Sequence, residues 1–108
     1  MDWTVEFLNT TVRDEITAMP PDIRARLERI VNLIQSHGLT NVHEPFVKHL
    51  EGPLWEMRMK GRDGIGRAIY VTVSQRRVII VRGFIKKTQK TPLRELEIAR
   101  KRAKEILP

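Results

Sequence analysis

The side chains that could do chemistry in this sequence are lysines and arginines gathered between residues 54 and 92. They alternate with short apolar runs instead of forming one charged block, so several of them fall within predicted strands. A charged side chain cannot face a protein core cheaply, which favours positions on an exposed face of a sheet. The set consists of Arg58, Lys60, Arg62, Arg67, Arg76, Arg77, Arg82, Lys86, Lys87 and Lys90. Such a face can bind a multiply charged anion.

The charge is distributed unevenly along the 108 residues, whose formal net charge is +7. Residues 1–54 hold five basic and eight acidic side chains, a net charge of −3, whereas residues 55–108 hold fifteen basic and five acidic ones, a net charge of +10. The second half therefore predicts a polyanionic partner, which could be nucleic acid, an anionic membrane surface or an acidic protein. The run Arg100, Lys101 and Arg102 has a simpler explanation as the solvated side of a helix.

Three segments of the basic stretch predict a meander of antiparallel strands. They span residues 54–59, 67–74 and 77–85, are rich in Val, Ile and aromatic residues, and are separated by turn-forming residues at 61–64 and 74–76. The third segment is apolar at both alternating sets of positions, which is typical of an interior strand covered on both sides. Arg82 is the exception within it. It either pairs with Glu56 or another carboxylate across the sheet, or contacts a ligand, and the sequence favours neither.

The remaining segments predict helices around this meander. A strand at residues 3–8 precedes a short helix that begins at Asn9 or Thr10 and ends before the Pro20-Pro21 pair. A second helix at residues 22–36 carries an apolar stripe and closes at Gly38, and residues 37–53 read as a connection with at most one irregular turn. A last helix begins with Thr91 as N-cap and Pro92 in the first turn. The predicted fold is α+β, in the order β-α-α-β-β-β-α, with the helices on one face of a small sheet.

Composition limits the class of protein. A chain of this length forms one domain, here residues 1–108, and no run of ~18 apolar residues is present for a membrane span. Cysteine is absent, which excludes disulfides and thiolate metal sites, and His37, His43 and His49 lack metal-ligand spacing. An acidic residue at position 2 argues against a signal peptide. We therefore expect a soluble cytoplasmic protein without a metal, a cofactor or a membrane partner.

Four strings within the basic stretch resemble a known family. They are LWEMR at residues 54–58, GRAIY at 66–70, VIIVRGFIKKT at 78–88, and KTP at 90–92 followed by a helix with Ala99. Together they resemble the RelE/HigB superfamily of type II toxins, and most closely its phage-derived HigB-like branch. The resemblance covers residues 3–107 in element order. It implies a RelE-like fold, a small mainly antiparallel sheet with a two-helix N-terminal hairpin and a C-terminal helix.

The resemblance also implies a function. Members of this superfamily are small basic toxins that cleave mRNA, commonly on the translating ribosome, and are neutralised by a cognate antitoxin that in this branch is usually a helix-turn-helix protein. Matching motifs place the catalytic set at Arg58, Arg67, Lys86 and Lys87, and further RNA-binding cations at Lys60, Arg62, Arg82 and Lys90. Several relatives carry a catalytic Tyr or His near the C-terminus, and this sequence has neither there.

Clustered lysines and arginines could supply what metal-free RNA cleavage requires. The reaction needs a base for the 2′-hydroxyl, a cation for the charge that builds on the phosphate, and an acid for the departing 5′ oxygen. A lysine crowded by other cations gives up its proton more easily, whereas an arginine stays charged and clamps a phosphate. We expect Lys86 or Lys87 to be the base and the arginines to stabilise charge. Tyr70 could stack an RNA base, although core packing is the more common role.

Two other functions remain compatible with the sequence. The ParE toxins are related, share the fold and bind DNA gyrase without cleaving anything, and fold alone cannot separate the two activities. A basic RNA-binding module without toxicity is the third possibility. Lys86, Lys87 and Arg67 favour the nuclease.

Overall fold

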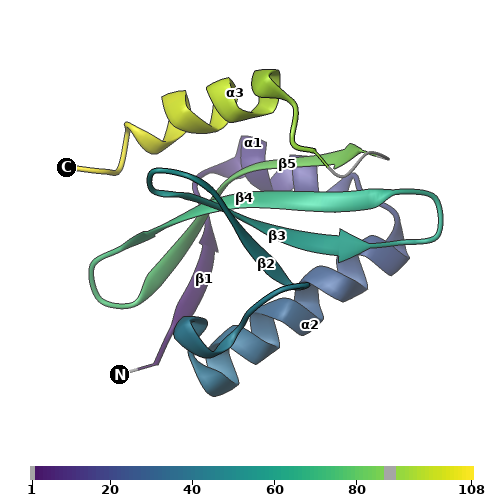
Figure 1. Ribbon diagram of the computed structural model, residues 1–108, viewed down its shortest axis with the longest axis horizontal. Helices are drawn as coiled ribbons and strands as arrows, with labels where there is room; N and C mark the ends of the chain where they lie inside the picture. Colours follow the sequence, from purple (N-terminus) through teal and green to yellow (C-terminus); the bar gives the residue numbers. More distant parts are fainter. Residues whose placement is uncertain (1, 87–89) are drawn as a thin grey trace.

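The computed structural model describes residues 2–86 and 90–108, which form one mixed sheet and three helices (Figure 1). The elements are β1 (Thr4–Phe7), α1 (Thr10–Thr17), α2 (Pro21–His37), the short 3-10 helix η1 (Leu39–Asn41), β2 (Val47–Glu51), β3 (Leu54–Lys60), β4 (Ile65–Val73), β5 (Arg77–Lys86) and α3 (Leu93–Ala103). In this part of the chain the sheet has five strands in the order β1-β5-β4-β3-β2, and only the β1–β5 pair is parallel. The predicted α+β class and the three-stranded meander are confirmed.

The predicted connection at residues 37–53 is wrong in its second part, because residues 47–51 form the edge strand β2. It pairs antiparallel with β3, with Val47 opposite Met57 and His49 opposite Trp55. Only Val47 of this strand is buried, and Lys48 and His49 are exposed. An edge strand with one buried position lacks the apolar alternation by which strands are recognised in a sequence.

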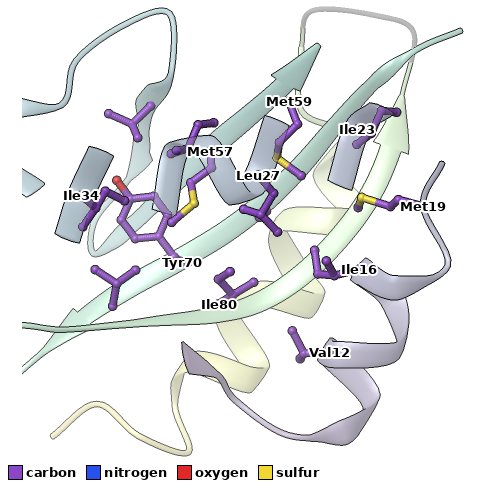
Figure 2. Close-up of a cluster of buried hydrophobic side chains, with 14 of the residues drawn as sticks. Val12, Ile16, Met19, Ile23, Leu27, Ile34, Met57, Met59, Tyr70 and Ile80 are labelled. Atoms are coloured by element: carbon purple, nitrogen blue, oxygen red, sulfur yellow. The ribbon is translucent and has the colours of Figure 1, made fainter. Parts of the chain in front are cut away.

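Helices cover both faces of the sheet, so the prediction of helices on one face is wrong. Apolar side chains of α1 and α2 pack on one face, where Figure 2 shows Ile16, Leu27 and Ile34 with Met57 and Tyr70 of the sheet. Ala99 and Ala103 of α3 pack on the other face, in a second cluster with Leu54, Ile69, Val71, Ile79, Val81 and Phe84. Figure 1 shows α3 on the opposite side of the sheet from α2. The inner strands β4 and β5 carry apolar side chains on both faces. Helices on one face alone would therefore leave the apolar side chains of the other face exposed to water.

A bulge in β5 decides which way its last residues face. Ile80 lies opposite Tyr70 and Arg82 lies opposite Ile69, so Val81 is an extra residue in the ladder. The extra residue moves Arg82 and Phe84 to the α3 face, where Phe84 joins the second cluster. Strict alternation would have placed both on the opposite face.

Helix ends follow the predictions at two of three positions. The side chain of Asn9 accepts a hydrogen bond from the amide of Val12 at 3.0 Å and caps α1. Gly38 ends α2 with a φ of 84°, a left-handed value that glycine adopts without strain. Thr91 was predicted as the N-cap of α3, but Pro92 occupies that position and no side chain caps the helix. The Thr91 hydroxyl instead forms hydrogen bonds with Glu56 and Arg67.

Candidate functional site

A buried charged network lies between β3, β4 and the start of α3. Glu56 of β3 and Arg67 of β4 are both 0 % exposed. The Thr91 hydroxyl donates to Glu56 Oε2 at 2.7 Å and accepts from Arg67 Nη1 at 3.1 Å. The same Arg67 nitrogen lies 3.5 Å from Glu56 Oε1, which also accepts from Arg58 Nε at 2.9 Å. Two arginines and a threonine therefore hold one buried carboxylate.

The network separates the two arginines that were predicted to be catalytic. Arg58 and Arg67 lie directly opposite each other on adjacent strands, so their side chains project from the same face of the sheet. Arg58 keeps 19 % of its side chain exposed, whereas Arg67 has none exposed. Burial lowers the pKa of Arg67, the charge of Glu56 opposes this, and the charge of Arg58 lowers it further. The structure thus places Arg58 at the surface and Arg67 behind it.

Exposed lysines continue this face towards the end of the sheet. Lys60 and Lys86 lie on either side of Ile65, in one row across β3, β4 and β5. Both are exposed, and alternation along β3 puts Lys60 on the same face as Arg58. We call Arg58, Lys60 and Lys86 the basic face. Lys90 is also exposed and lies one residue before Thr91, and Lys87 lies outside the described residues.

Two other predicted RNA-binding arginines are engaged differently. Arg62 is exposed in the turn between β3 and β4, and its backbone amide donates to Asp22 Oδ2 at 2.8 Å. Arg82 pairs with two carboxylates, through Nε with Glu95 at 2.9 Å and through Nη1 with Glu15 at 2.8 Å. The interpretation of Arg82 as paired with a carboxylate is confirmed, but the carboxylates belong to helices α1 and α3 and do not lie across the sheet.

Glu15 is the centre of this second network, which joins α1 to α3. It accepts bonds from Arg102 Nη1 and Nη2, both at 2.9 Å, and from the amide of Gly83 at 3.1 Å. Burial would raise the pKa of Glu15, but the hydrogen bonds from Arg102 and Gly83 and the charges of Arg82 and Arg102 together lower it. The network fixes both helices against the bulged part of β5.

Tyr70 has a structural role. It is 1 % exposed and packs with Met57 and Ile34 under α2, on the face opposite the basic face (Figure 2). Burial raises its pKa. The core-packing interpretation is confirmed, and Tyr70 does not reach the basic face.

The comparison with known proteins assigns the family. Residues 14–104 match the model of the family described as "Phage derived protein Gp49-like". The chain belongs to this Gp49-like family. Among solved structures, the chain is similar to one from the crystal structure of the archaeal RelE–RelB complex of Pyrococcus horikoshii OT3, with a TM-score of 0.61 and 18 % identity over 83 % of this chain and 100 % of that chain. The RelE-like fold is therefore confirmed. The sequence has no significant match among curated proteins.

The structure of this Gp49-like protein adds two residues that sequence reasoning did not place in the site. Glu56 was considered only as a partner for Arg82, and Thr91 only as a helix cap. An acid at an alternating strand position beside two strand arginines was the available signal for Glu56. Within the described residues, no helix has the length and apolar composition to cross a membrane.

Proposed function

We propose that this Gp49-like protein is the toxin of a type II toxin–antitoxin system, of the HigB-like kind, and that it cleaves mRNA without a metal ion. Family membership and the RelE-like fold support a toxin. The single observation that supports RNA as target is the basic face, where Arg58 is oriented by the buried carboxylate of Glu56 next to two exposed lysines.

The chemistry divides among the residues of this face. In the proposed reaction the 2′ oxygen attacks the adjacent phosphorus, its proton passes to a base, the bond from phosphorus to the 5′ oxygen breaks, and that oxygen takes a proton from an acid. Lys86 and Lys87 are the proposed proton carriers, and Arg58 stabilises the charge that develops on the phosphate. Lys60, Arg62 and Lys90 bind the flanking phosphates. Arg67 is buried and Arg82 is paired with two carboxylates, so in this proposal both position other residues and do not contact RNA.

The proposed partner is a cognate antitoxin, of the helix-turn-helix type. The similar RelE chain was crystallised as a RelE–RelB complex. A net charge of +7 and a basic face support an antitoxin that brings acidic side chains to the toxin.

Primer extension on a cellular mRNA after induced expression tests the proposal. Cuts within codons that vanish when the antitoxin is co-expressed are the expected result. The same assay with purified protein and mRNA, with and without ribosomes, shows whether the ribosome is required. Intact mRNA with arrested replication would instead identify a gyrase inhibitor, and RNA binding without cuts or growth arrest would identify a binding module. Either result would overturn the nuclease proposal.

A further inference from the structure

A hollow of about 550 Å³ opens at the edge of β3, next to the basic face. Four parts of the chain line it: Arg26 and Arg29 of α2, Glu44 and Phe46 before β2, Arg58 and Lys60 of β3, and Ile65 of β4. Its volume lies within the range of pockets that enclose small organic ligands.

The hollow exists because β2 does not cover the whole of β3. The ladder between the two strands ends with Val47 opposite Met57, and the amide of Arg58 donates to the Phe46 carbonyl at 2.9 Å. Beyond that bond, no strand in the described residues pairs with the β2 side of Met59 and Lys60. The start of α2 lies close to the end of β3, where a Cβ at Gly61 would clash with the side chain of Ile23. The helix therefore forms the opposite wall.

The lining carries unbalanced positive charge. Arg26, Arg29, Arg58 and Lys60 face one acid, Glu44. Arg26 and Arg29 are exposed, and neither they nor Lys60 form an ion pair within the part of the chain that the structure describes. Cations gathered around a concave surface from separate elements attract an anion more strongly than the same charges spread over a flat helix face. Two other charged residues of the helix, Arg24 and Glu28, line a different hollow.

An aromatic side chain completes the lining. Phe46 is half-buried, with part of its surface packed on the core under α2. A ring anchored in this way can stack a nucleobase, and aromatic stacking beside a cationic groove is how proteins bind single-stranded nucleic acids. A paired base would first have to be unstacked and flipped out of its duplex to enter the hollow, which costs energy that a single strand does not spend.

Two residues belong to both places, since Arg58 and Lys60 line the hollow and form part of the basic face. We propose that the hollow binds one nucleotide of single-stranded RNA on one side of the cleaved bond, with its phosphates on Arg26 and Arg29 and its base on Phe46. This inference rests on the proposed function, because the bound RNA strand passes over Arg58 from the cleavage site into the hollow.

Binding of fluorescent single-stranded RNA tests the phosphate contacts. Two variants are compared. Both carry Lys86→Ala and Lys87→Ala to prevent cleavage, and the second, the arginine variant, also carries Arg26→Ala and Arg29→Ala. Each phosphate contact on a single strand contributes about 0.7 to the slope of log affinity against log salt, so the loss of two should lower the slope by about 1.4 and the affinity at low salt by about tenfold. Lys101→Ala with Lys104→Ala, two exposed lysines of the last helical region, removes the same charge and should change the slope by less than half as much.

Abasic substitutions test the base contact. One abasic position in an RNA series should lower affinity by about fivefold or more, which is the effect of losing a stacked base. Phe46→Leu keeps an apolar side chain on the core, so the melting temperature should change little. In this variant the abasic substitution at the stacked position should no longer lower RNA affinity, while the other abasic positions should behave as in the parent. The inference would be overturned by an unchanged salt slope in the variant that lacks Arg26 and Arg29. It would also be overturned if abasic substitutions lowered the RNA affinity of the parent and of Phe46→Leu equally.

The cleavage assay separates this inference from the proposed function. With Lys86 and Lys87 intact, Arg26→Ala with Arg29→Ala should raise KM for a short RNA and leave kcat within about twofold, because binding that is equal in ground and transition states affects KM. Normal binding without cleavage would refute the nuclease alone. Normal cleavage and RNA binding with loss of neutralisation by the antitoxin would show that an acidic peptide occupies the hollow, and the RNA inference would be wrong.

Discussion

Arg58 and Arg67 lie directly opposite each other on β3 and β4, yet they share one carboxylate and only Arg58 reaches the surface. Like charges at opposed strand positions repel each other. Glu56 offsets that repulsion, so the surface arginine is oriented by a residue that no substrate touches.

Replacement of Glu56 by Gln should therefore destabilise the protein. The change leaves Arg67 buried without its counter-charge, and breaking a buried pair typically costs about 3–5 kcal/mol. Chemical unfolding measures the loss. Glu97→Gln on the exposed side of α3 is the control and should stay within about 0.5 kcal/mol of the parent. Equal free energies of unfolding in both variants would mean that the network does not stabilise the fold.

Thr91 gives a subtler test of the same network. Thr91→Val keeps the shape of the side chain but removes the hydroxyl that joins Glu56 to Arg67. We expect a loss of about 1–3 kcal/mol, because charged groups lose a buried partner, and Thr91→Ser should recover most of it. Thermal melting of the three proteins compares them. If Ser were as unstable as Val, the methyl group and not the hydroxyl would matter.

Stability should fall at acidic pH through Glu15. Folding lowers the pKa of this carboxyl below its ordinary value of 4.5, so its contribution is complete above pH 4.5 and is lost as pH falls through the folded-state pKa. Glu15→Gln should reduce the free energy of unfolding at pH 7 and make the further loss on going to pH 3 smaller than in the parent. Glu28→Gln, at an exposed position of α2, should follow the parent at both pH values. Parallel curves for the parent and Glu15→Gln would refute this role.

Lys86, the last residue of β5, and Lys87, the next residue in the sequence, should affect activity and not stability. Lys86 is exposed, and Lys86→Ala with Lys87→Ala should abolish mRNA cleavage and growth arrest while the free energy of unfolding stays within about 0.5 kcal/mol. Lys101→Ala with Lys104→Ala is the matched control and should remain toxic. Arg100 is unsuitable for that control because it pairs with Glu51, with Nη2 2.7 Å from Oε1. Toxicity retained in a folded Lys86→Ala, Lys87→Ala protein would exclude the proposed proton carriers, and equal loss from both pairs would indicate bulk charge.

Periodicity in the sequence was sufficient for most of the fold. The helical stripe of α2, the strand character of β3 to β5 and the turn residues between them were all visible, because each buries a regular set of side chains. Strand β2 was missed because Val47 is its only fully buried residue. The second helical layer was missed because α3 has only Ala99 and Ala103 fully buried.

The candidate site was less accessible to sequence reasoning, because it depends on register. In the sequence Arg58 and Arg67 look alike, because both are arginines within predicted strands. Only the structure shows that the side chain of Arg67 is buried and that of Arg58 is partly exposed. The side on which Arg82 emerges is set by the extra residue Val81, which interrupts alternation without any glycine or proline to signal it. The hollow beside Arg26 and Arg29 requires α2, the segment before β2, and strands β3 and β4 to meet, and the predicted connection at residues 37–53 hid one of these segments.

The pairing of β1 with β5 also sets the order of events during synthesis. Thr4 lies opposite Arg77, and Thr91 completes the network around Glu56. The closed sheet therefore cannot form on a nascent chain until β5, which ends at Lys86, has left the ribosomal exit tunnel, and the network around Glu56 is completed only when Thr91 follows. A protein that we propose to cleave mRNA thus lacks its completed site while the segment up to residue 91 is still inside the ribosome that makes it.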